Sequence, residues 1–161
     1  MKKFRSHGAF GALMDEYEKS VIELQLVIKN INQEELVAIA DIDTKDPDCK
    51  SIQTVLTHVV RAGYGYVTEI RKYLGEDVEF KDGVILDSIE SYHQALNDMF
   101  QYNVQLFEDH PEIQLEEYKD ENKIAVRWGQ KYDVEQLLEH AIVHILRHRR
   151  QIEKFLMSLR S

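Results

Sequence analysis

Histidines recur at four-residue intervals near the C-terminal end of the sequence. His140, His144 and His148 lie in a stretch whose apolar residues return every three or four positions, which predicts an amphipathic helix. At about 100° per residue, His148 lies about 40° and His144 about 80° from the centre of the apolar face. Imidazoles at positions i and i+4 of a helix can bind the same metal ion, because they lie one turn apart on one side. His140 lies near 120° from that centre, and we expect it to be solvated.

A metal site of this kind needs a further ligand from another part of the chain. His58 is the best candidate, since it lies at the edge of another apolar stripe. Its neighbours on the same side are small, namely Ser51, Ala62 and Gly65, and small neighbours suit a pocket better than a packed core. Three neutral imidazoles would leave a coordination position open, and all-nitrogen ligation favours Zn, Ni, Cu or Fe over Mg or Ca. His93 competes for the third place, and hydrogen-bonded core histidines without a metal are the alternative.

Apolar spacing over most of the chain predicts the helices that must position these side chains. The predicted helices cover residues 10–31, 32–39, 51–74, 87–110 and 133–159. Capping boxes are expected at three helix starts, formed by Asn32 with Glu35, Asp87 with Glu90, and Asp133 with Gln136. Gly75 and Pro111 stand where two helices are expected to end. Four long amphipathic helices in 161 residues indicate an all-α four-helix bundle, and this length fits a single domain, residues 1–161.

The segments between the predicted long helices differ in character. Residues 41–50 form a polar loop, and residues 76–86 form a connector that contains a turn signal. Residues 112–132 form a long connector before the last helix, and its apolar residues alternate with polar ones in two runs separated by residues 120–122. This alternation predicts a small β-hairpin, with an ordered loop as the alternative.

Charge and composition exclude several classes of partner. Acidic residues outnumber basic ones by 29 to 20, and the net charge of −9 argues against a nucleic-acid partner. No apolar run reaches the roughly 18 residues of a spanning helix, so we expect no membrane partner. No apolar segment follows the basic residues Met1-Lys2-Lys3-Phe4-Arg5, so a signal peptide is not expected. The single cysteine, Cys49, excludes an internal disulfide and is typical of the reducing cytosol, so we expect a cytoplasmic protein.

Two segments resemble the motifs of one protein family. Residues 137–152 are similar to the C-terminal signature of the DinB/YfiT-like superfamily, a His followed after three residues by His-Arg-x-Gln-Ile. Residues 51–58 resemble the second-helix motif of the same superfamily, a Ser-Ile start with a His seven residues on. The length and the order of the helices also match, so the resemblance covers nearly the whole chain. Arg150 departs from the pattern, which often has Gly there, and this affects the helix surface near the site rather than the ligands.

The resemblance implies a fold, a site and a set of reactions. The fold would be an up-down-down-up four-helix bundle, and homodimers are common in the superfamily. The site would be a three-His divalent metal site on His58, His144 and His148, with Ni or Zn as the usual occupant. Relatives with known reactions include metal-dependent thiol transferases, a maleylpyruvate isomerase and metal-dependent hydrolases.

The chemistry of such a site follows from its charge. A cation held by three neutral histidines would acidify a bound water or hold a bound thiol as thiolate, so either would be a nucleophile near neutral pH. We therefore expect a metal-dependent thiol S-transferase acting on a low-molecular-weight thiol or other small molecule, with a metal-dependent hydrolase as the first alternative. A non-catalytic metal-binding or structural dimer is the second alternative, because no general base is evident beside the histidines. The sequence assigns no catalytic residue.

Other polar residues of these helices could support the site. Gln151 and Glu69 are candidates to orient the imidazoles, although a solvated helix face is the alternative and is favoured for Glu69. Gly63 and Gly65 within one predicted helix suggest close approach of another helix or room for a ligand. An arginine run in the last helix could bind an anionic thiol or a carboxylate, with a solvated face as the alternative. The run consists of Arg147, Arg149 and Arg150.

Overall fold

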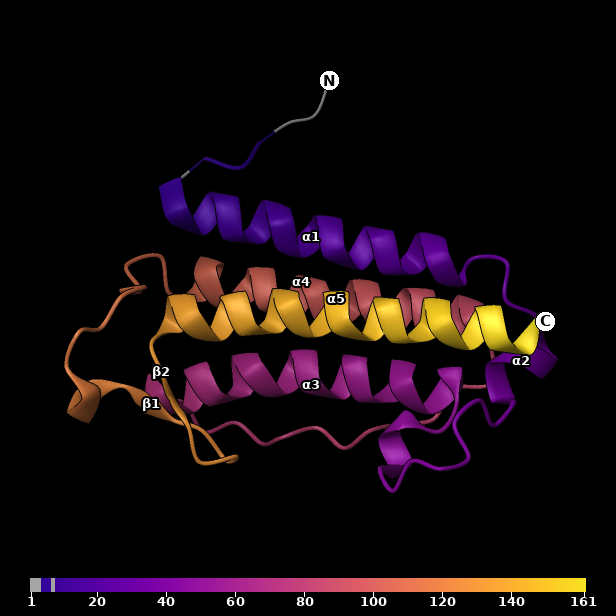
Figure 1. The fold of residues 1–161 in the computed structure, drawn as a ribbon. Helices are drawn as coiled ribbons and strands as arrows, with labels where there is room; N and C mark the ends of the chain where they lie inside the picture. The colour runs from indigo at the N-terminus through magenta and orange to yellow at the C-terminus, as the bar shows by residue number, and fades with distance from the viewer. Residues whose placement is uncertain (1–3, 7) are drawn as a thin grey trace.

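Helices dominate the computed structural model, which describes residues 4–6 and 8–161 (Figure 1). The long helices are α1 (Gly8–Ile28), α3 (Ile52–Tyr73), α4 (Ile89–Asp109) and α5 (Val134–Leu159). The short elements are α2 (Gln33–Val37), the 3-10 helices η1 (Pro47–Cys49) and η2 (Asp120–Asn122), and the strands β1 (Ile124–Ala125) and β2 (Lys131–Tyr132). None of the described helices combines the length and the apolar character needed to cross a membrane. The residues Met1-Lys2-Lys3, on which the signal-peptide expectation partly rests, lie outside the described part.

Side-chain caps fix where the helices begin. The capping boxes predicted at Asn32 and Asp133 are confirmed, and Ser51 forms a further one with Thr54 at the start of α3. The box predicted at Asp87 is wrong by one residue, because the hydroxyl of Ser88 accepts the backbone N–H of Ser91 instead. Asp87 and Ser88 are adjacent residues of capping type, so the sequence pattern alone does not choose between them.

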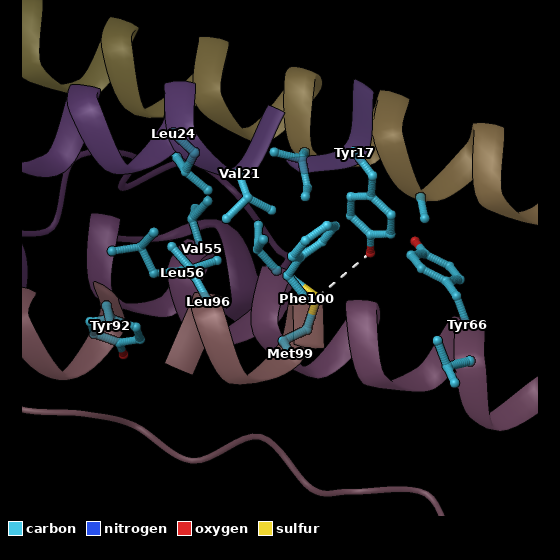
Figure 2. Packing of buried hydrophobic residues seen from close by; sticks show 14 of the residues in the cluster. Tyr17, Val21, Leu24, Val55, Leu56, Tyr66, Tyr92, Leu96, Met99 and Phe100 are labelled. Atoms are coloured by element: carbon cyan, nitrogen blue, oxygen red, sulfur yellow. Dashed lines mark hydrogen bonds between the residues drawn. The ribbon is translucent and has the colours of Figure 1, made fainter. Parts of the chain in front are cut away.

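The four long helices lie side by side, and α1 and α3 each pack against both α4 and α5 (Figure 1). Their apolar stripes form one buried cluster (Figure 2). In that cluster the hydroxyl of Tyr17 on α1 donates to Met99 Sδ on α4 across 3.6 Å. Tyr17 and Met99 have no exposed surface, so this contact joins two helices in the centre of the core.

The connector before α5 differs from its prediction. The two strands pair antiparallel, with Ile124 opposite Tyr132 and Ala125 opposite Lys131. The hairpin therefore turns around Gly129, which has a φ of +85°, and not at residues 120–122. Only Gly readily adopts this conformation, so Gly129 was the stronger turn signal.

At Gly63, α4 packs too closely against α3 to leave room for a side chain. This agrees with one of the two interpretations of the sequence, the close approach of another helix. A Cβ added there would lie 2.3 Å from Met99 Sδ, whereas a Cβ at Gly65 would meet only Arg127 Nη2, at 3.6 Å. Met99 is also held by Tyr17 and by the Asn103 amide, so it has little freedom to withdraw.

We expect Gly63→Ala to lower the free energy of unfolding by about 1–3 kcal/mol, the usual effect of overpacking. Gly65→Ala is the matched control and should leave stability unchanged or raise it by up to about 1 kcal/mol, because Ala favours the helix. Urea unfolding of both variants measures the difference. Equal stabilities for the two variants would contradict the close approach at Gly63.

Candidate metal centre

Three histidine nitrogens converge between α3 and α5. His58 Nε2 lies 2.9 Å from His144 Nε2, and His148 Nε2 lies 3.2 Å from the same atom. The three residues form a group whose ligand atoms all lie within 4.8 Å of one another. The structure thus brings together the three residues that the sequence analysis selected, whereas His93 on α4 is not part of this group.

Local helix geometry explains the convergence. His144 and His148 are one turn apart on α5, and both are buried, with 7% of each residue exposed. His58 lies two turns after the Ser51 cap of α3, and α3 packs directly against α5. The His58 side chain is 24% exposed, so solvent reaches the cluster from its side.

Hydrogen bonds hold the outer nitrogens of two of the three rings. His58 Nδ1 lies 3.1 Å from Asp48 Oδ2, and His148 Nδ1 lies 2.8 Å from Gln151 Oε1. Asp48 and Gln151 both offer acceptors, which favours a proton on each Nδ1 and a lone pair on each Nε2 facing the cluster, while Arg61 Nη2, a donor, also lies 3.3 Å from His58 Nδ1. The remaining ring, His144, can donate one N–H to only one of these two Nε2 atoms. One of the two contacts between Nε2 atoms therefore has no proton to form a hydrogen bond.

A bound transition metal would satisfy this arrangement. Metal–nitrogen bonds of about 2.0–2.1 Å place cis ligand nitrogens roughly 2.9–3.4 Å apart, for octahedral to tetrahedral angles. The observed separations of 2.9 and 3.2 Å fall in that range. Imidazole donors fit Zn, Ni, Cu or Fe, and they fit Mg or Ca poorly.

The protonation state also fits a ligand role. Burial, followed by the charges of His148 and His58, lowers the pKa of His144 to about 2. Burial likewise lowers the pKa of His148, and the hydrogen bond that His148 donates to Gln151 Oε1 opposes this shift. Both imidazoles are therefore neutral at pH 7, which is the form that binds metals.

Asp48 is the site residue that sequence reasoning missed. It lies in η1, inside the segment expected to be a plain polar loop, and its Oδ2 also accepts from Arg61 Nη2 at 2.5 Å. Cys49, the next residue, lies 4.0 Å from Gln151 Oε1. Through Asp48, the 3-10 helix η1 contacts His58 Nδ1, on the side of the ring that faces away from the cluster. Through Cys49, it contacts Gln151, the hydrogen-bond partner of His148. The available signal was the Asp-Pro-Asp sequence, in which Asp46 caps the turn.

Two other interpretations of the sequence need correction. Glu69 is neither solvated nor in contact with the histidines: it is 7% exposed and accepts hydrogen bonds from Arg127. His140 is half-buried among aromatic rings instead of solvated, because the hairpin turn covers its face of α5 with Trp128. Gln151 does contact His148, as the sequence suggested.

We expect Asp48→Asn to weaken metal binding by about 10–100-fold, the usual effect of losing a carboxylate that orients a metal-binding histidine. Asp46→Asn is the control, since asparagine also caps the turn and, among the described residues, Asp46 makes no hydrogen bond to a histidine and acts on His148 only through its charge. Calorimetric titration with Ni²⁺ and Zn²⁺ measures both affinities. Equal loss in the two variants would show that Asp48 acts only through the fold of the loop.

The geometry defines a class of protein: a helical bundle with three convergent imidazoles from two neighbouring helices. Residues 12–159 match the sequence profile of the DinB family. This match covers most of the chain, so the protein belongs to the DinB family. The comparison with curated proteins found no match.

Proposed function

We propose that the protein is a metal-dependent enzyme that binds a divalent transition metal, Ni or Zn, on His58, His144 and His148. The observation that carries this proposal is the convergence of the three rings: His144 Nε2 lies 2.9 and 3.2 Å from the Nε2 atoms of His58 and His148, and acceptors hold two of the outer nitrogens. Two helices and the η1 turn hold these rings in place, so the site is largely formed before any cation arrives.

Thiol S-transfer is the chemistry that we propose for this site. When bound, the cation would lower the pKa of a coordinated thiol or water enough to make it a nucleophile near neutral pH. Asp48, the carboxylate that contacts the cluster, is turned toward the outer side of His58 and toward Arg61. It is therefore badly placed to remove a proton from an attacking water, which supports a thiol that ionises on binding over hydrolysis.

The test of this proposal is turnover by the metal-loaded protein. Low-molecular-weight thiols are combined with electrophilic acceptors, and the loss of free thiol is followed with wild type and with His144→Ala as the inactive control. Thiol consumption by wild type alone supports transfer. Hydrolysis of esters or amides without thiol consumption would point to the hydrolase, and no turnover with metal bound would leave a non-catalytic metal-binding protein.

The proposal includes the wider organisation of the protein. We propose that the protein is a cytoplasmic homodimer and that each chain is a single domain. In this domain the long helices run up, down, down and up in chain order. Support for the order comes from Figure 1, in which the connector after α3 returns along the bundle, so that α4 begins where α3 begins. Support for a dimer comes from Ile22 and Leu26, which lie one turn apart on α1 and are 48% and 63% exposed. Light scattering in solution tests the oligomeric state.

A further inference from the structure

A series of aromatic rings leads from His144 to the protein surface. The His140 ring stacks on His144 with centroids 6.4 Å apart, and the Trp128 indole stacks on His140 at 5.8 Å. Tyr66 on α3 makes edge contacts with the Trp128, His140 and His144 rings at 5.4–5.9 Å. Trp128 is 43% exposed, so this series ends in an aromatic surface that solvent can reach.

A buried carboxylate holds the turn that carries Trp128. Glu69 Oε1 on α3 accepts from the backbone N–H and from Nε of Arg127, at 3.2 and 3.3 Å. The Arg127 guanidinium lies over the Phe80 ring, 3.4 Å from its centroid. These contacts tie the hairpin turn to α3, so the indole is held next to the metal centre instead of moving freely with a loop.

Arg147 is a cation without a partner beside these rings. It lies three residues after His144 on the same edge of α5, and among the described residues it is exposed and makes no ion pair or hydrogen bond. Within the part of the chain that the structure describes, every arginine except Arg147 and Arg150 is paired with a carboxylate. The paired residues are Arg5, Arg61, Arg71, Arg127, Arg149 and Arg160. An unpaired guanidinium at this place is notable in a chain with a net charge of −9.

The charge of Arg147 acts on the residues of this edge. After burial, Arg147 is the next cause that lowers the pKa of His140. Burial raises the pKa of Tyr66 on the neighbouring helix, and the charge of Arg147 opposes that rise. Arg147 therefore lies close enough to His140 and Tyr66 for its charge to act on both. Arg150 is about 200° from His148 around α5 and so faces another side of the helix.

We propose that the edge formed by Tyr66, Trp128, His140 and Arg147 binds a planar organic anion, an aromatic or conjugated carboxylate. This inference rests on the proposed function and names the class of its electrophilic substrate. The carboxylate pairs with Arg147, since a guanidinium matches a carboxylate in charge and shape. The planar body lies against the exposed indole, which is separated from His144 by the His140 ring.

The chain reports on this subsite directly, because Trp128 is its single tryptophan. Intrinsic fluorescence is titrated with benzoate and with benzamide, its neutral analogue, in metal-loaded and in chelator-treated protein. We expect saturable binding of benzoate in both forms and at least tenfold weaker binding of benzamide. In both forms Arg147→Gln should weaken benzoate binding by about tenfold, as expected for the loss of a charge-assisted hydrogen bond. Arg150→Gln is the matched control and should bind benzoate like wild type.

Several results would overturn the subsite. These are no saturable binding of benzoate, equal binding of benzamide, or unchanged benzoate affinity in Arg147→Gln. If benzoate binds only to the metal-loaded form, and binds wild type and Arg147→Gln equally, benzoate is a ligand of the metal. This result would also overturn the subsite. If the protein binds no metal but benzoate binding still depends on Arg147, the subsite stands and the proposed function fails. Unchanged circular dichroism in both variants shows that the comparison is between folded proteins.

Discussion

Replacing His144 with alanine is expected to weaken the binding of Ni²⁺ or Zn²⁺ by more than about 100-fold. Its Nε2 lies closest to the other two ligand atoms, at 2.9 Å from His58 and 3.2 Å from His148. Losing it leaves two donors on different helices, below the three protein ligands typical of a catalytic metal site. The expected loss therefore exceeds the 10–100-fold effect of removing an orienting partner. Calorimetric titration and metal analysis of the purified protein measure it.

His93→Ala provides the control for this substitution. His93 is also half-buried and was the sequence-level competitor for the third ligand position, but it lies on α4 outside the cluster. Metal affinity should be the same as wild type in this variant. A similar loss in both variants, or full metal content in His144→Ala, would show that the three histidines do not hold the cation.

Removing the metal is expected to lower the thermal stability of the protein markedly. A ligand that binds only the folded state stabilises it by about 4 kcal/mol when its concentration is 1,000 times Kd. For a domain of this size, that corresponds to roughly 8–16 °C in Tm. The reason lies in the structure, because the cation would join α3 to α5 at two buried histidines and one half-buried histidine.

Differential scanning calorimetry checks this effect with one sample in chelator and one with excess Ni²⁺ or Zn²⁺. The variant His144→Ala should show the same Tm in both conditions, since it has lost the site. Identical Tm values for wild type with and without metal would mean that no cation binds the folded state preferentially.

The helices and the histidine pair on α5 could be predicted because their signals are local. Asn32 and Asp133 show their capping boxes within four residues, and His144 and His148 share a helix side by spacing alone. The apolar spacing alone did not decide between His58 and His93 as the third histidine, since it does not say which helices are neighbours. The resemblance to a family supplied that step, and the structure brings His58 to 2.9 Å from His144.

The surroundings of the site could not be predicted because they depend on how distant segments pack. Asp48 lies in a polar loop, and only the packing of η1 against α3 turns its carboxylate toward His58. Glu69 was assigned to a solvated face, because nothing near it in the sequence points to Arg127, 58 residues away. The same holds for Trp128, whose place over His140 is set by a turn at Gly129.

Anomalous X-ray scattering from crystals grown with Ni²⁺ or Zn²⁺ shows whether the three histidines hold the cation. Data collected above and below the absorption edge of the metal locate the ion without reference to its ligands. We expect one strong peak between α3 and α5, about 2.0–2.1 Å from the Nε2 atoms of His58, His144 and His148. A peak elsewhere, or none at that point with the metal in excess, would contradict this expectation.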